Sequence, residues 1–238
     1  NHQTVKGTAV YELSDWQQRA RQQGFIEQAI IGGRRVAALS GATFAAINPA
    51  SGQVLAQVAA CAEAEVDLAV RSARQAFEAG VWSQRTPAER KQVLLRLAEL
   101  ILANRDELAL LDSLNMGKPV MDAWNIDVPG AAGVFRWYAE SLDKRYDEVA
   151  PSAANVLATI TREALGVVAA VVPWNFPLDM AAWKLAPALA AGNSVVLKPA
   201  EQSPFSALRL AELALEAGLP EGVMNVVPGL GEAAGKAL

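Results

Sequence analysis

Residues 166–177 read GVVAAVVPWNFP, a run of small and β-branched apolar residues that ends in an amide between two aromatic residues. A run of this kind, bounded by Gly and Pro, is typical of a strand in a parallel sheet. The sequence therefore predicts a strand at Val167–Val172 that is buried on both faces. A neutral amide at the end of such a strand, here Asn175, is a good hydrogen-bond donor to a developing oxyanion. Asn is also a common turn residue, so a purely structural role stays open.

The segments after this strand repeat an alternation of strand and helix. A helical pattern covers Met180–Ala191, an apolar strand covers Ser194–Leu197, a helix capped at Ser203 follows, and a third strand covers Met224–Val227. This alternation predicts an α/β fold with a Rossmann-like parallel sheet and helices on its faces. Ligands of such sheets bind beyond the carboxyl ends of the strands.

The second strand exit carries Lys198 and, three residues later, Glu201. A carboxylate there can accept hydrogen bonds from two ribose hydroxyls, and it would repel a 2′-phosphate, which favours NAD over NADP. A surface ion pair is the alternative interpretation. The third exit has glycines at 229, 231 and 235, which allow a phosphate or an adenine to approach the backbone, or a helix to pack closely.

Upstream, short alternating stretches between residues 25 and 60 predict a small antiparallel unit. Helical patterns follow, the last of them at about Val128–Lys144. Residues 145–165 predict a protruding β-hairpin, either a surface excursion or a strand pair that docks on another subunit.

Composition excludes several classes of function. The 238 residues are 52% hydrophobic with a net charge of -4 and no Lys/Arg stripe, so no nucleic-acid partner is expected. The longest apolar run is too short to span a bilayer and no signal peptide stands out, so no membrane partner is expected. One cysteine, Cys61, fits a reducing cytoplasm, and we expect it to be a small buried filler. His2 is the single histidine, so a histidine metal site or a Ser-His-Asp triad is not expected.

Longer motifs carry a resemblance to a known family. PWNFP at 173–177, WKLAPALAAGNSVVLKPAEQSP at 183–204 and GLPEGVMNVVPG at 218–229 closely resemble the NAD(P)-dependent aldehyde dehydrogenases. NMGKP at 115–119 and RWYAE at 136–140 agree. DVPGAA at 127–132 is most similar to the γ-glutamyl-γ-aminobutyraldehyde dehydrogenases of putrescine breakdown.

The resemblance implies a role for each matching residue. Asn175 would stabilise the oxyanion, and the hairpin would mediate assembly into a homodimer or homotetramer. The implied contacts to NAD, with NADP possible, are Val171, Pro173, Trp174, Asn175, Lys198, Ala200, Glu201, Gly231 and Gly235.

The resemblance also implies chemistry for which this chain lacks two groups. In the family, a cysteine thiolate attacks the aldehyde, the thiohemiacetal loses hydride to the nicotinamide, and a glutamate activates the water that hydrolyses the thioester. Both residues would lie beyond residue 238, so we expect a fragment that is inactive alone. The expected division is 1–144 and 166–238 for the cofactor-binding domain and 145–165 for the oligomerisation hairpin, with the catalytic domain absent.

Four residues bear on the substrate. Asp179, Met180 and Trp183 lie at the start of the helix that would line the aldehyde tunnel, and Asp127 offers a second carboxylate. An acidic group there would attract an aldehyde that carries an ammonium group, although Asp179 also suits the dipole of a helix N-terminus. A semialdehyde or betaine-aldehyde dehydrogenase, an enzyme that uses CoA instead of water, and a non-catalytic NAD-binding fragment are the alternatives.

Overall fold

The computed structural model describes residues 12–238, so His2 lies outside the described residues. The helices are α1 (Leu13–Gln22), α2 (Glu63–Glu78), α3 (Pro87–Ala103), α4 (Arg105–Met116), α5 (Val120–Asp122), α6 (Val128–Ser141), α7 (Pro177–Ala190) and α8 (Phe205–Glu216). Shorter helical turns are η1 (Ala123–Asp127), η2 (Leu142–Lys144) and η3 (Gly231–Gly235). The strands are β1 (Ala29–Ile31), β2 (Arg34–Val36), β3 (Thr43–Ile47), β4 (Val54–Ala59), β5 (Glu148–Ala150), β6 (Ala158–Ile160), β7 (Val167–Val171), β8 (Ser194–Lys198) and β9 (Met224–Val226).

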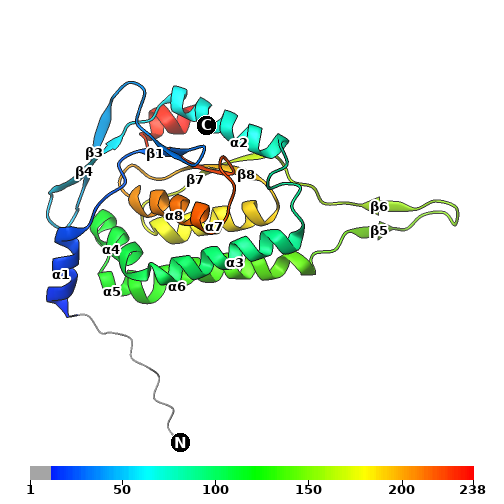
Figure 1. The fold of residues 1–238 in the computed structure, drawn as a ribbon, viewed down its shortest axis with the longest axis horizontal. Coiled ribbons are helices and arrows are strands. Elements are labelled where there is room, and N and C mark those ends of the chain that lie inside the picture. The colour runs from blue at the N-terminus through cyan, green and yellow to red at the C-terminus, as the bar shows by residue number, and fades with distance from the viewer. Residues whose placement is uncertain (1–11) are drawn as a thin grey trace, which may run out of the picture.

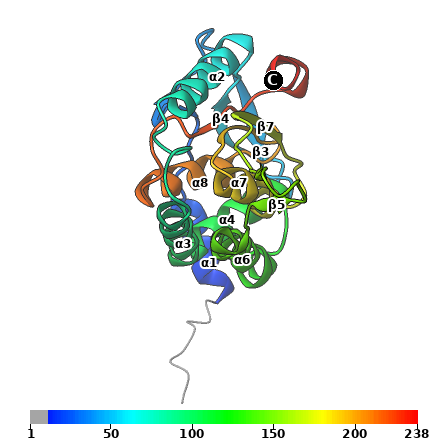
Figure 2. The ribbon, with the colours of Figure 1, turned by 90° about the vertical axis from the view of Figure 1, so that its right-hand side faces the viewer.

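The main sheet has five strands in the order β2-β1-β9-β8-β7. Strands β7, β8 and β9 are parallel, which confirms the predicted α/β fold with a parallel sheet. Helix α2 covers one face, α7 and α8 cover the other, and α3 and α6 form a further layer below them (Figures 1 and 2). The apolar residues of α3, α6, α7 and α8 and the sheet face above them form the largest core, and α2 packs on the opposite face of the sheet in a second, smaller cluster.

The prediction that the first strand is buried on both faces is wrong. β7 is the edge strand of the sheet, and the side chain of Val171 is 58% exposed. Its neighbour β8, which lies inside the sheet, is buried along its whole length. An apolar run shows that a strand belongs to a parallel sheet, but its place in the strand order depends on which neighbours pair with it.

The predicted antiparallel unit between residues 25 and 60 consists of two separate hairpins. β1 and β2 extend the main sheet, because β1 pairs antiparallel with β9 at Ile30 and Val226. β3 and β4 form a sheet of their own beside it. The first hairpin therefore belongs to the same sheet as the parallel strands predicted from the later residues.

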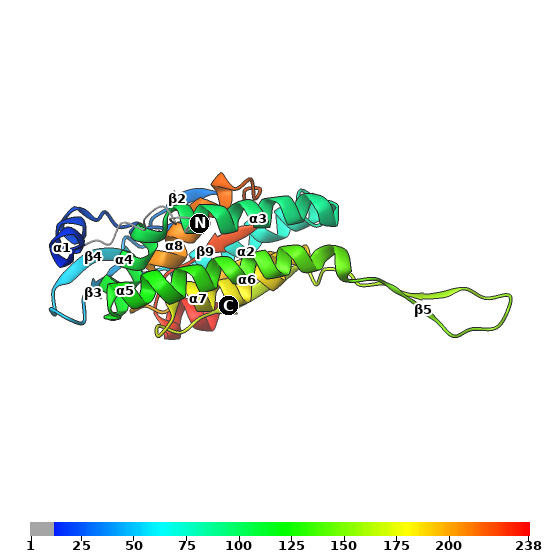
Figure 3. The same cartoon turned by 90° about the horizontal axis from the view of Figure 1, so that it is seen from below.

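The predicted hairpin at 145–165 is present and projects far from the body of the molecule (Figures 1 and 3). β5 and β6 pair at three positions, and the side chains of Val149, Leu157 and Ile160 are exposed. Among residues 12–238, every helix is too short or too polar to cross a bilayer.

The starts of α7 and α8 differ from the sequence patterns. α7 begins at Pro177 rather than at Met180, which places Asp179 in its first turn. A π-helical turn, η1, precedes α6 and ends at Asp127. Extra residues in such turns rotate the side chains that follow, and π-helical turns often occur at functional sites. Ser203 does not cap α8, since its hydroxyl has no hydrogen-bond partner within the described part of the chain.

Candidate active site at the strand ends

The three strand exits meet at one edge of the sheet. Val171 pairs with Lys198, Leu197 pairs with Val226, and the N–H of Val172 donates to the carbonyl of Lys198 at 3.2 Å. A pocket of about 410 Å³ opens at this edge. Its wall takes Trp174 from the first exit, Glu201 and Gln202 from the second, and Leu230 from the third, and the remaining residues come from the β3 hairpin and the end of α4: Phe44, Ala45, Ile47, Pro49, Asn115 and Met116.

Asn175 lies in the turn between β7 and α7. Its side chain is exposed and, among residues 12–238, makes no hydrogen bond, so both N–H groups are available to a ligand. The turn is held at both ends, by the Val172 N–H described above and by the Met180 N–H, which donates to the Phe176 carbonyl at 2.8 Å. The arrangement therefore presents a free amide on a turn whose two ends are fixed.

Lys198 and Glu201 lie together as predicted, although the lysine does not reach the surface. Lys198 is 3% exposed, and its Nζ donates to the Pro199 carbonyl at 3.0 Å and to Glu201 Oε2 at 3.2 Å. Glu201 is about one-third exposed and faces the pocket. The lysine thus orients the carboxylate from behind.

The other predicted cofactor contacts fit close backbone approach. Val171 and Pro173 are exposed at the rim, whereas Ala200 is buried and offers its backbone alone. A Cβ at Gly231 would meet only open space, and one at Gly235 would lie 3.7 Å from the Lys198 side chain. Open space above Gly231 is what a ligand that packs on backbone requires.

Asn115 is a site residue that the sequence analysis quoted in a motif without giving it a role. Its side chain is buried, its Nδ2 donates to the Gln202 carbonyl at 2.8 Å, and its Oδ1 accepts from the Phe205 N–H at 3.2 Å. It therefore ties the end of α4 to the loop that follows Glu201. In the sequence, its place two residues before the helix-ending Gly117 was the only indication of such a role.

The four predicted substrate residues divide into two groups. Asp179, Met180 and Trp183 lie at the start of α7, where Trp183 is exposed and its ring N–H bonds the Asp179 carboxylate. Burial, and then the charge of Asp127, raise the pKa of Asp179 above its ordinary value. Asp127 itself is 3% exposed and forms an ion pair with Lys118, so it does not present a free carboxylate to the surface.

Asp112 is a buried carboxyl beneath the first turn of α7. It accepts a long hydrogen bond, 3.4 Å, from the Leu178 N–H. Burial raises the pKa of Asp112 to about 7, against the lowering effects of Ser206 and that N–H, while Asp127 raises it further and Lys118 lowers it. Near neutral pH this carboxyl therefore exchanges a proton.

The raised pKa of Asp112 predicts a pH dependence of stability. Below pH of about 4 the carboxyl is protonated in both the folded and the unfolded chain, so it costs nothing. Between pH of about 4 and 7 the unfolded chain releases the proton that the folded chain retains, so stability falls as pH rises. Between pH 5 and pH 8 the free energy of unfolding of Asp112→Asn, measured with urea, should rise by about 1–3 kcal/mol relative to that of the wild type. An unchanged difference across that range would contradict the assignment.

Cys61 is buried, as expected, and it is not a reactive thiol. Burial and the charge of Glu65 raise its pKa to about 12. Its carbonyl would lie 2.4 Å from a Cβ at Gly229, so the third strand exit passes over Cys61 at a distance that only glycine allows.

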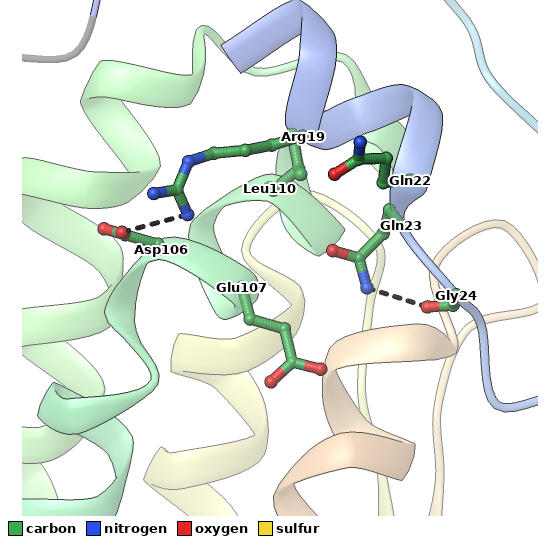
Figure 4. A pocket seen from close by; sticks show the side chains of 7 residues that line it. All are labelled: Arg19, Gln22, Gln23, Gly24, Asp106, Glu107 and Leu110. Atoms are coloured by element: carbon green, nitrogen blue, oxygen red, sulfur yellow. Dashed lines mark hydrogen bonds and ion pairs between the residues drawn. The ribbon is translucent and has the colours of Figure 1, made fainter. Parts of the chain in front are cut away.

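A second pocket, of about 220 Å³, lies between α1 and α4 (Figure 4). Arg19 and Asp106 form an ion pair across it at 3.3 Å, and the Gln23 side chain donates to the Gly24 carbonyl at 2.7 Å. None of the strand-exit residues lines this pocket, so it is separate from the site described above.

Comparison with known proteins places this geometry in a family. Residues 36–238 match the model of the aldehyde dehydrogenase family. The chain is 50% identical over 228 residues to the NADP/NAD-dependent aldehyde dehydrogenase PuuC of Escherichia coli. This match covers 96% of this chain and 46% of PuuC. It is 54% identical over 212 residues to an aminoacetaldehyde dehydrogenase of Pseudomonas aeruginosa, across 89% of this chain and 43% of the relative.

A solved structure agrees with the sequence relatives. The γ-glutamyl-γ-aminobutyraldehyde dehydrogenase of Burkholderia cenocepacia superposes with a TM-score of 0.94 at 54% identity, over 96% of this chain and 46% of that one. The chain thus spans about half the length of the relatives it matches. The chain belongs to the aldehyde dehydrogenase family.

Proposed function

We propose that this chain supplies the coenzyme-binding and oxyanion-stabilising part of an enzyme that oxidises an aldehyde to a carboxylate with NAD. The observation that carries the proposal is the meeting of three strand exits around one pocket, with the free amide of Asn175 in the first exit. The relatives, which include the NADP/NAD-dependent aldehyde dehydrogenase PuuC, support the same reaction. The nucleophile and the base of that reaction would lie outside these residues.

The residues present fit a nicotinamide dinucleotide. Glu201 would accept hydrogen bonds from the ribose hydroxyls, with Lys198 holding its carboxylate, and the backbone at Gly231 would allow close contact. When bound, the coenzyme supplies the acceptor for hydride. The side chain of Asn175 would donate to the carbonyl oxygen as negative charge develops on it. Trp174 would exclude water from the pocket, since its ring lines the wall.

The binding part of the proposal is tested by titrating the chain with NAD in a calorimeter, and the reaction by following reduction of NAD by the full-length protein with a panel of aldehydes. Absence of heat with NAD, together with absence of aldehyde-dependent reduction, would end the proposal.

Glu201→Gln should weaken NAD binding roughly 10–100-fold, because a charge-assisted hydrogen bond to ribose becomes a neutral one. NADP should lose much less, since the variant no longer repels a 2′-phosphate. Calorimetry with both coenzymes measures the change, and Glu78→Gln, at an exposed position of α2, is the matched control. Equal losses for NAD and NADP would contradict the ribose assignment.

We propose an aldehyde that carries a remote ammonium group as the substrate, because Asp179 is a half-buried carboxyl with Trp183 beside it, in the first turn of the helix that the family resemblance assigns to the aldehyde tunnel. Asp179→Asn should reduce the kcat/KM preference for an aminoaldehyde over acetaldehyde roughly 10-fold. In the wild type the preference should be lost as pH falls through the raised pKa of Asp179, because the carboxyl becomes neutral. Asp67→Asn on α2 is the control, and a preference that stays with Asp179→Asn would overturn the charge argument.

The proposal includes a homodimer or homotetramer in the cytoplasm. The projecting β5–β6 hairpin supports assembly, since its apolar side chains Val149, Leu157 and Ile160 are exposed and a two-stranded hairpin alone is marginally stable.

A further inference from the structure

The exposed turn that carries Asn175 lacks support from its own side chains. Pro173, Trp174, Asn175 and Phe176 are all exposed, and the Phe176 ring is 40% exposed. The backbone bonds at the two ends of the turn do not fix the rotation of the peptide units between them. A contact from another element is needed to set the direction of the Asn175 amide.

Lys118 makes such a contact. Its Nζ lies 3.6 Å from the centroid of the Phe176 ring, within the range of a strong cation–π interaction. The same Nζ forms the ion pair with the buried Asp127, and the lysine side chain is only 14% exposed. The buried ammonium is therefore held by two contacts at once, the Asp127 carboxylate and the face of the Phe176 ring, and a movement away from this place would weaken both.

The backbone around Lys118 is also fixed. Gly117, with φ of 83°, ends α4 in the left-handed conformation, and Pro119 follows the lysine directly. On the other side, the π-helical turn η1 ends at Asp127 and directs its carboxylate inward. Asp112 and Asp179 lie close enough for Lys118 to lower the pKa of each, so this ammonium lies near three carboxylates, those of Asp112, Asp127 and Asp179.

We propose that Lys118 is a positioning residue for Asn175: oriented by Asp127, it clamps the Phe176 ring and thereby sets the direction of the neighbouring amide. This inference rests on the proposed function, in which Asn175 donates to the oxyanion. The alternative is that the Lys118–Asp127 pair only stabilises the junction between α4 and α6.

Kinetics of the full-length protein separate the two. Lys118→Met keeps the length of the side chain and removes the charge, so kcat should fall roughly 10-fold while KM for NAD changes less than about 2-fold. Lys118→Arg, which still stacks on a ring and pairs with a carboxylate, should restore kcat to within about 3-fold. The matched control is Lys91→Met, which breaks the Lys91–Asp143 ion pair at the far end of the helical layer and should leave kcat unchanged.

A double-mutant cycle gives the decisive outcome. If Lys118 acts through Asn175, Lys118→Met should cause no further loss of kcat in an Asn175→Ala background. Phe176→Leu should reproduce the loss, and adding Lys118→Met to it should change nothing more. Fully additive losses in either background would overturn the proposal.

A spectroscopic readout does not depend on activity. In protein labelled with ¹⁵N-asparagine, the side-chain amide signals of Asn175 are assigned by their disappearance in Asn175→Ala. These signals should move in Lys118→Met and stay in place in Lys91→Met. If the wild type oxidises no aldehyde, the proposed function fails and the amide signals still decide the positioning role. Unmoved Asn175 signals in a folded Lys118→Met variant would refute it.

Discussion

Replacing Asn175 with alanine is expected to lower kcat for aldehyde oxidation by the full-length protein roughly 100–1000-fold, a loss of about 3–4 kcal/mol of transition-state stabilisation. The side chain is exposed and unbonded within residues 12–238, so removing it disturbs no internal contact. The loss should therefore fall on the transition state, with KM for NAD nearly unchanged.

Steady-state kinetics with the aldehyde and NAD varied separately measure this effect. Asn155→Ala, at the exposed tip of the β5–β6 hairpin, removes the same side chain away from the pocket and should retain wild-type kcat. A kcat within about 3-fold of wild type for Asn175→Ala would show that the amide serves the turn and not the reaction.

Trp82→Ala should cause the largest loss of stability, about 3–5 kcal/mol. Trp82 lies in the turn between α2 and α3, yet its ring is fully buried in the main core. Its Nε1–H donates to the Leu189 carbonyl near the end of α7 at 2.9 Å, and the Arg85 guanidinium lies 5.6 Å from its ring centroid. Truncation therefore leaves a large cavity and removes one hydrogen bond to the Leu189 carbonyl, which still accepts from the Gly192 N–H at 3.0 Å.

Urea unfolding of the chain measures the loss. Trp82→Phe retains most of the packing but not the donor, so it should cost roughly 1–3 kcal/mol less than the full truncation. Trp137→Ala, at a mostly exposed ring on α6, is the control and should change the free energy of unfolding by less than about 1 kcal/mol. Equal effects at Trp82 and Trp137 would contradict the account of the core.

Much of the fold could be predicted from the periodicity of apolar residues and from the Gly and Pro residues that end helices and strands. The parallel strands and the hairpin at 145–165 were predicted because each depends on residues close together in the chain. The edge position of β7 could not be predicted in this way. Its apolar composition resembles that of β8, and pairing between distant segments decides which of the two strands lies at the edge of the sheet.

The site was predictable to the same extent. Asn175 and Glu201 stood out because each follows a strand that had to end at the ligand-binding edge. Lys118 did not stand out. The left-handed Gly117 sets the position of Lys118, the π-helical turn η1 sets that of Asp127, and a helical pattern in the sequence reveals neither feature. Asp127 was noticed for its charge, and its burial against Lys118 became evident only from the three-dimensional structure.

The hydrogen bond from Val172 to Lys198 joins the turn of Asn175 to the loop of Glu201 through neighbouring strands in register. The two loops therefore keep a constant separation, which is set by the register of β7 and β8. A molecule that is bound by one loop meets the other loop at a high effective concentration, so its second contact forms without a further loss of translational freedom. Molecules too short to bridge the opening gain nothing from this arrangement, which makes length itself a criterion of selection.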